Sequence, residues 1–169
     1  MVPNSEEHLS WCLDKEQIEF DSPNDMLAGD YLDKAREALE VADLLEKNEY
    51  YDWAVTASYY ARYFALTALL RKCGLVVDNH SCAITLFKVA FVSKGELEEE
   101  LLGSIKKGKR NRIEKQYGIT RTPDTTAKKQ RKEAINFVTE ITGYLQGISQ
   151  NAIEEVRKRV EKLKQNKRG

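Results

Sequence analysis

Residues 52–74 read DWAVTASYYARYFALTALLRKCG, and the pattern of this segment is the main guide to the fold. Alanine recurs there at a spacing of three or four residues, at positions 54, 57, 61, 65 and 68. Such a ridge of small side chains permits close packing between helices. Because the segment is apolar on nearly every side, we expect a helix at the centre of a bundle or in a dimer interface. Asp52 is the predicted N-cap, and Gly74 is the predicted C-terminal stop.

The flanking sequence predicts further helices around this central one. Apolar residues at helical spacing indicate helices from about Asp30 to Asn48, His80 to Ser93 and Glu96 to Gln116. Another apolar stripe runs from Ala134 to Leu163, which predicts one continuous helix over about 125–163. Its end would project beyond the bundle, where it needs either the segment 6–18 or a second chain as its partner.

The predicted fold is therefore all-α: an antiparallel up-and-down bundle of four to five helices with a long C-terminal helix. Residues 1–27 are predicted to be an acidic N-terminal appendage with one short helix near 6–18, and residues 28–169 to form the bundle. No apolar run reaches the eighteen residues that a membrane helix needs. The N-terminus does not resemble a secretory signal, so we expect a cytoplasmic protein.

Cysteine and histidine are too sparse to indicate a metal centre. Cys12, Cys73 and Cys82 are odd in number and lack C-x-x-C spacing, which predicts reduced, structural cysteines without a disulfide framework or zinc site. His8 is expected to be solvated, and His80 to be a cap or a hydrogen-bonded strut. The chain has no glycine loop that would hold a phosphate, so no cofactor is predicted.

Charge is unevenly distributed, although the formal net charge is zero. Residues 1–50 hold fourteen acidic and four basic side chains, whereas residues 106–132 hold eleven basic and two acidic ones. A positive patch of this density attracts phosphate, on RNA or on a nucleotide. Alternatively, the acidic N-terminal part folds over the basic part and neutralises it.

The basic run is densest in the helix predicted over 96–116. Lysines there would bind phosphate as point charges, and arginines could bind it bidentately. An aromatic ring at the end of the run offers base stacking. The candidate phosphate-binding or nucleic-acid-binding residues are Lys106, Lys107, Lys109, Arg112 and Tyr117. A basic helix end also satisfies the helix dipole, so the pattern alone does not specify function.

Two stretches resemble the HEPN family of small helical domains. Its pattern Y-Y-A-x-F-x-x-A-x-x-L-L-x-x-x-G falls on residues 59–74, with Tyr63 where phenylalanine is usual. A second pattern, H-S-x-x-x-x-x-F, falls on His80, Ser81 and Phe87. The resemblance covers about residues 30–150. It implies a helical fold, and it implies a homodimer, since many HEPN domains are dimeric, metal-independent ribonucleases and often toxins.

The resemblance also implies a site in the basic run. The family motif is R-[polar]-x-x-x-H, often followed by x-Y, and Arg110, Asn111 and Tyr117 match it, with Lys115 in place of the histidine. By resemblance, Arg110 would bind the scissile phosphate, Asn111 would orient it and Lys115 would stand in for the general acid or base. Histidine suits proton transfer near neutral pH. A lysine ammonium is a poor base, which argues against efficient cleavage but preserves phosphate binding.

Two functional interpretations follow. One is a toxin-like homodimer that binds or acts on RNA with a variant ribonuclease motif. The other is a non-catalytic module that binds a nucleotide or docks a small nucleotidyltransferase, for which the resemblance makes Tyr117 the candidate adenylyl acceptor. A plain helical scaffold with a neutralised basic end remains a third interpretation.

Overall fold

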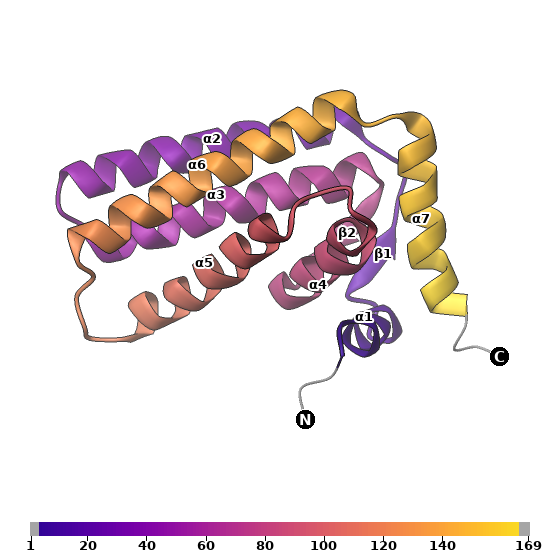
Figure 1. The fold of residues 1–169 in the computed structure, drawn as a ribbon, viewed down its shortest axis with the longest axis horizontal. Coiled ribbons are helices and arrows are strands. Elements are labelled where there is room, and N and C mark those ends of the chain that lie inside the picture. The colour runs from indigo at the N-terminus through magenta and orange to yellow at the C-terminus, as the bar shows by residue number, and fades with distance from the viewer. Residues whose placement is uncertain (1–3, 166–169) are drawn as a thin grey trace.

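The computed structural model describes residues 4–165 and is predominantly helical, as predicted. Its elements follow in chain order (Figure 1): α1 (Ser5–Asp14), β1 (Ile18–Phe20), α2 (Asp25–Lys47), α3 (Tyr51–Lys72), β2 (Leu75–Val77), α4 (His80–Ala90), a 3-10 turn (Val92–Lys94), α5 (Glu99–Tyr117), α6 (Asp124–Gly147) and α7 (Gln150–Gln165).

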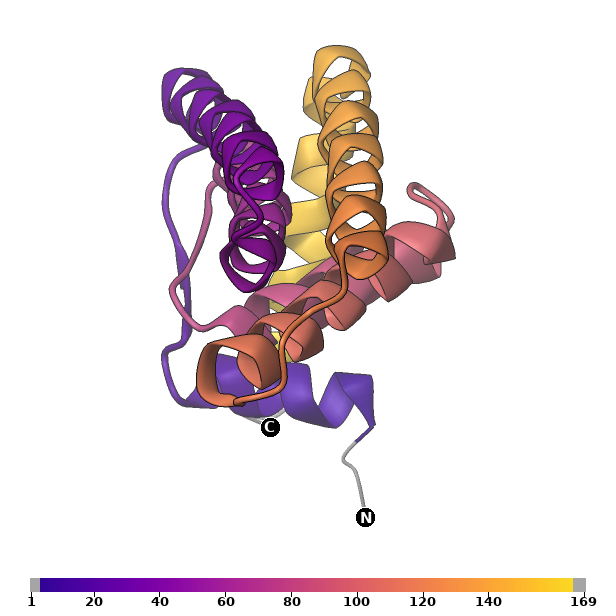
Figure 2. The same cartoon turned by 90° about the vertical axis from the view of Figure 1, so that its left-hand side faces the viewer.

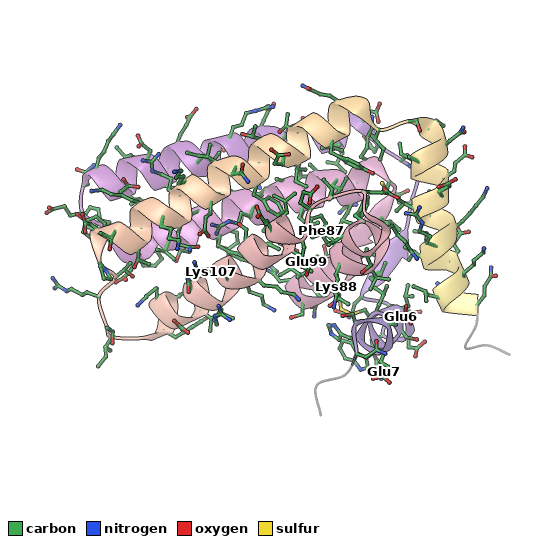
Figure 3. All side chains as sticks on the ribbon, viewed as in Figure 1. Glu6, Glu7, Phe87, Lys88, Glu99 and Lys107 are labelled. Carbon is green, nitrogen blue, oxygen red and sulfur yellow. A yellow bond between two sulfur atoms is a disulfide. The ribbon has the colours of Figure 1, made fainter. Side chains whose placement is uncertain are left out.

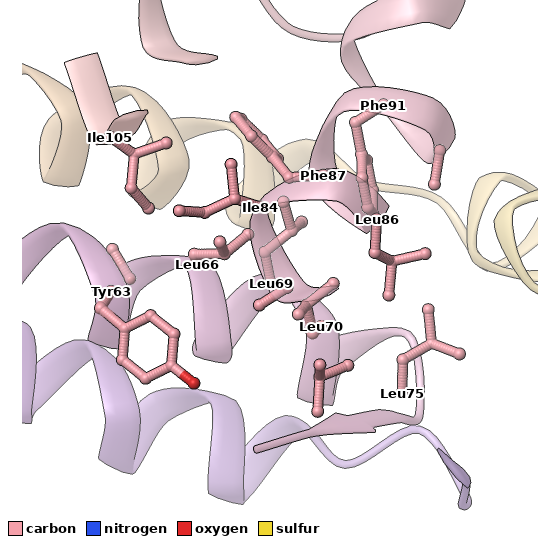
Figure 4. Packing of buried hydrophobic residues seen from close by; sticks show 14 of the residues in the cluster. Tyr63, Leu66, Leu69, Leu70, Leu75, Ile84, Leu86, Phe87, Phe91 and Ile105 are labelled. Carbon is pink, nitrogen blue, oxygen red and sulfur yellow. The ribbon is translucent and has the colours of Figure 1, made fainter. Parts of the chain in front are cut away.

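Helix α3 is the centre of the molecule, which confirms the prediction from its alanine ridge. It packs against α2, α5 and α6, and Figure 2 shows α2 and α6 side by side above α5. Ala61, Ala65 and Ala68 are completely buried. Leucines at positions 66, 69 and 70 of α3 meet Phe87 and its neighbours on α4 in the core (Figure 4).

The ends of α3 agree only in part with the sequence prediction. Gly74 follows α3 with a φ of 67°, and a Cβ there would collide with the backbone oxygen of Asp21, so glycine is required. Asp52, however, lies within the first turn and is not the N-cap. Its carboxylate instead accepts the backbone N–H of Thr122 at 3.0 Å. It thereby ties the loop between α5 and α6 to the start of α3.

Helix α2 begins earlier than predicted, because Asn24 caps it. The Asn24 side chain accepts the backbone N–H of Leu27 at 2.9 Å, satisfying a donor of the first turn. The helix ends with Asn48 as its C-cap, as predicted.

The predicted continuous helix over 125–163 is wrong, because the chain breaks into α6 and α7. Ile148 adopts an extended conformation (φ −66°, ψ 127°), and the hydroxyl of Ser149 accepts the backbone N–H of Ala152 at 3.2 Å. Helix α7 therefore turns back across the end of the bundle and packs against α1 and α4 (Figure 1). Its partner is the N-terminal segment of the same chain, and it does not project.

Two short strands were not predicted. Strands β1 and β2 pair antiparallel, with Ile18 opposite Val77 and Phe20 opposite Leu75. Three residues per strand are too few to show the alternation by which a strand is predicted from sequence. The pairing attaches the N-terminal segment to the connection between α3 and α4.

The cysteine prediction is also wrong, because Cys12 of α1 and Cys82 of α4 form a disulfide. Cys73 is free and buried. His8 is not solvated either: its Nδ1 lies 2.8 Å from the hydroxyl of Thr85 on α4. Sequence spacing gave no sign of these contacts, since the paired residues are far apart in the chain.

None of the helices in residues 4–165 combines the length and the apolar character that crossing a membrane requires.

Candidate functional site

Helix α5 carries every candidate site residue. Glu99 and Glu100 lie in its first turn, where carboxylates complement the helix dipole. Leu101, Leu102 and Ile105 bury one face of the helix against the bundle. The helix ends at Tyr117, since Gly118 is extended (φ −87°, ψ 163°). The basic run thus occupies the C-terminal half of a helix that is anchored by its N-terminal half.

The inward face of this basic half contacts a buried arginine. The guanidinium of Arg62 on α3 is fully buried and donates to the Gln130 side chain at 3.1 Å and to the Gln130 backbone oxygen at 2.8 Å. A carboxylate oxygen of Glu133 lies 3.6 Å from Nη2 of Arg62. Burial lowers the pKa of Arg62 to about 10, which leaves it charged at neutral pH. The Arg62 guanidinium therefore links α3 to α6, and it lies against Gly108 of α5.

Arg112 and Lys109 also face inward, toward aromatic side chains of α3 and the start of α4. Arg112 donates to the hydroxyl of Tyr60 at 2.9 Å, and its guanidinium lies 5.4 Å from the ring centre of Tyr59. The ammonium of Lys109 donates to the hydroxyl of Ser81. These two cations are therefore engaged within the chain.

His80 is the centre of that aromatic cluster. Asn79 caps α4, and His80 is the first helical residue. Its Nδ1 lies 2.6 Å from the hydroxyl of Tyr59, and its ring stacks on Tyr63 with centroids 3.7 Å apart. Burial, followed by the charges of Arg112 and Lys109, lowers the pKa of His80 to about 4. The imidazole is thus neutral at physiological pH and held by hydrogen bonding, as expected for a strut.

The outer face of α5 is different, since its cations form no ion pair with any other residue in the range 4–165. Lys106, Arg110 and Tyr117 are exposed, and Tyr117 retains 77% of its accessible surface. Arg110 and Tyr117 are seven residues apart, about two turns, so they share one face. Among residues 4–165, no carboxylate lies within ion-pairing distance of Lys106, Arg110 or Lys115. Within the part of the chain that the structure describes, the outer face of α5 thus presents unpaired positive charge to the solvent.

Asn111 and Lys115 lie half-buried on a flank of α5, one helical turn apart. Residues five apart on an α-helix diverge by about 140°, so Arg110 and Lys115 do not point in one direction. A single helix therefore does not bring the matched motif residues together around one point.

A hollow of about 580 Å³ adjoins this flank, between α5 and α6. Its lining includes Lys107, Lys129 and Lys132. The ammonium of Lys107 lies 3.5 Å from a carboxylate oxygen of Glu133. Glu100 and Glu133 also line the hollow, so its charges are mixed.

Acidic residues neutralise only part of the basic run. Glu6 and Glu7 lie on α1, which packs on α4 and α7, whereas Lys107 lies on the side of α5 that faces α6 (Figure 3). On α6, Arg131 pairs with Glu46 of α2 at 2.6 Å. The expectation that the acidic N-terminal part covers the whole basic run is therefore wrong for the exposed end of α5.

Sequence reasoning missed the cluster of Tyr59, Tyr63 and His80 with Arg112. The i, i+4 spacing of the two tyrosines on a buried helix was a usable signal, but nothing in the sequence linked Arg112 to them.

Comparison with known proteins identifies the family. The family model described as "HEPN domain" matches residues 28–148. The chain belongs to the HEPN family. Its relatives include a "UPF0332 protein" of Thermotoga maritima, 41% identical over 68 residues, which are 40% of this chain and 52% of that protein. They also include "Putative toxin MJ0605" of Methanocaldococcus jannaschii, 32% identical over 123 residues, which are 72% of this chain and 85% of the relative.

A third HEPN relative, "Putative toxin MJ0142" of the same archaeon, is 30% identical over 89 residues, or 53% of this chain and 60% of its own length. The chain thus spans between half and three-fifths of the length of two of these three relatives. The N-terminal segment that carries α1 and Cys12 lies outside the HEPN match, whereas Cys82, to which Cys12 is bonded, lies inside it.

Proposed function

We propose that this HEPN protein is a toxin-like homodimer that binds RNA through the exposed end of α5 and cleaves it weakly or not at all. The observation that supports this most is the outer face of α5, where Lys106 and Arg110 have no carboxylate partner and Tyr117 is exposed beside them. Cations of this kind bind backbone phosphates, and an exposed ring stacks on a base for about 1–3 kcal/mol.

Weak cleavage follows from where the imidazoles lie. The only histidines of the chain are His8 and His80. His80 is bound to Tyr59 and Tyr63, and His8 lies at the contact between α1 and α4. The exposed end of α5 therefore holds no imidazole for proton transfer. Lys115 can bind a phosphate or stabilise charge there, but it is a poor base.

Dimerisation is supported by an apolar groove of about 340 Å³ between α2 and α3. The residues that line it include Val41, Leu45, Trp53, Ala57 and Tyr60. Exposed apolar side chains gathered in one groove favour association. Because Tyr60 also binds Arg112, a second copy in this groove would lie next to α5, and two basic helix ends would approach one RNA strand.

A matched pair of variants tests the dimer. Val41 in the groove and Ile135 on α6 are equally exposed, at 43% and 42%. We expect Val41→Glu to be monomeric by light scattering, because it places a charge in the groove, and Ile135→Glu to remain dimeric. A wild-type protein that is monomeric at all accessible concentrations would contradict the dimer.

An RNA cleavage assay in EDTA tests the function, with wild type, Lys115→His and Arg110→Ala. We expect wild type to bind RNA and cut it slowly or not at all, and Lys115→His to cut faster. Arg110→Ala should bind more weakly. If no variant binds or cuts RNA, the proposal is wrong.

The exposed hydroxyl of Tyr117 favours a second candidate, in which a nucleotidyltransferase partner adenylylates it. Protein isolated from its natural host would then carry one adenylyl group on Tyr117. Unmodified Tyr117 under all growth conditions would exclude this role.

A further inference from the structure

The contact between α1 and α4 brings together three side chains that ligate metals. His8 and Cys12 lie one turn apart on α1, and Cys82 lies on α4. One ring nitrogen of His8 and the two sulfur atoms all lie within 4.8 Å of one another. The Nε2 atom of His8 is 3.8 Å from the Cys12 sulfur. Two thiolates and an imidazole form a common ligand set for zinc, and breaking the disulfide would make both sulfur atoms available as ligands.

A hydrogen bond orients the imidazole for this role. The Nδ1 atom of His8 lies 2.8 Å from the hydroxyl oxygen of Thr85, whereas the other ring nitrogen, Nε2, lies near the Cys12 sulfur. When Nδ1–H donates to Thr85, the lone pair of Nε2 points toward the two cysteines. Zinc-bound histidines generally have such a partner on their second nitrogen, and it fixes both tautomer and orientation.

We propose that the chain with reduced cysteines binds one zinc ion through His8, Cys12 and Cys82. A reducing thiol or phosphine supplies two electrons to the disulfide and is itself oxidised, and the two sulfur atoms become thiols. Zinc then displaces one proton from each thiol, so two thiolates balance the charge of the ion. This balance matters because both cysteines are fully buried, where unpaired thiolates would be costly.

The geometry requires little movement. Two thiolates around one zinc ion, each about 2.3 Å from it, lie roughly 3.8 Å apart. Cys12 and Cys82 have Cα atoms 5.8 Å apart, so small side-chain rotations place their sulfur atoms at that separation. Three ligands from the described residues leave one coordination position for water. The metal would join α1 to α4 in the reduced protein, as the disulfide does in the oxidised protein.

The test uses the full chain, reduced with a phosphine under anaerobic conditions and titrated with Co²⁺. We expect one ion per chain, with thiolate-to-cobalt charge-transfer absorption and visible bands of a tetrahedral site, all displaced by Zn²⁺. Trp11 is stacked on His8 with centroids 5.9 Å apart, so cobalt should quench its fluorescence. The oxidised chain should show none of these signals.

Variants separate the proposed ligands from other thiols. Thr85→Val removes only the hydrogen bond to His8 and should weaken zinc binding about 10- to 100-fold. His8→Gln should weaken it further, whereas Cys73→Ala should bind like wild type. Circular dichroism of each reduced variant shows whether it is folded. The proposal is overturned if the reduced wild type binds no metal in a one-to-one complex, or if His8→Gln and Thr85→Val both bind like wild type.

Discussion

Gly108 of α5 lies directly against the buried guanidinium of Arg62 on α3. A Cβ at position 108 would lie 3.3 Å from Arg62 Cζ and closer still to Nη1. Because Arg62 is fully buried and hydrogen-bonded to Gln130, it has no room to move away. The absence of a side chain at 108 therefore sets how closely the basic helix approaches the bundle.

This contact predicts opposite effects for two glycine substitutions in α5. Gly108→Ala should lower the free energy of unfolding by about 1–3 kcal/mol, since it overpacks a filled site. Gly103→Ala should raise it by roughly 0.5–1 kcal/mol, because alanine favours helix and nothing lies within 4 Å of the added Cβ. Urea denaturation measures both. Equal effects of the two substitutions would contradict the packing described for Arg62.

Of the two arginines of α5, Arg112 should contribute to folding stability, whereas Arg110 should contribute to RNA binding and little to stability. Arg112→Ala removes a hydrogen bond to Tyr60 and the contact with the Tyr59 ring, and should cost about 1–2 kcal/mol of unfolding free energy. Arg110→Ala removes an exposed side chain and should change stability by less than about 0.5 kcal/mol. Thermal and chemical denaturation test this. An Arg110→Ala variant as destabilised as Arg112→Ala would mean that Arg110 has a structural role.

His80 should make stability depend on pH between about 4 and 6.5. Its folded pKa is about 4, whereas a histidine in the unfolded chain titrates near 6.5. Between these values the unfolded state binds the extra proton, so the stabilisation by neutral His80 decreases as pH falls. The stability difference between wild type and His80→Gln should shrink over this window, and NMR should show His80 titrating near 4. A difference that stays constant with pH would refute the assignment.

The disulfide should stabilise the oxidised chain. It joins residues 70 apart in sequence, and constraining an unfolded loop of that length is worth about 4 kcal/mol. Reduction in EDTA should lower the free energy of unfolding of wild type and of Cys73→Ala by that amount. Cys12→Ser should be insensitive to reductant. If wild type and Cys12→Ser respond alike to reduction, the pairing is wrong.

The central part of the fold could be predicted from the sequence, because its signals are local. The alanine spacing identified α3, and Gly74 marked its end. The HEPN match likewise rested on residues within α3 and α4. Each of these features is set by periodicity or by backbone conformation over a few residues.

What could not be predicted depends on contacts between distant residues. The apolar stripe of α6 continues in phase into α7, so periodicity did not reveal the break at Ile148. The meeting of Cys12 with Cys82, and of His8 with Thr85, depends on how α1 docks. At the candidate site, the cations of α5 could be predicted from the sequence, but their orientation could not. That orientation is set by the buried contacts of Gly108 and Arg112.

The salt dependence of RNA binding tests whether the exposed end of α5 is the RNA-binding surface. The dissociation constant of a short single-stranded RNA would be measured over a series of salt concentrations for wild type, Arg110→Ala, Lys106→Ala and Lys158→Ala. Lys158 is an exposed cation on α7 and serves as the control for loss of one charge.

We predict that affinity falls steeply with salt. Arg110→Ala and Lys106→Ala should each weaken binding and reduce the logarithmic salt slope by about 0.7, the value for one phosphate contact on a single strand. Lys158→Ala should match wild type. If all three variants bind RNA as wild type does, the exposed end of α5 is not the RNA-binding surface.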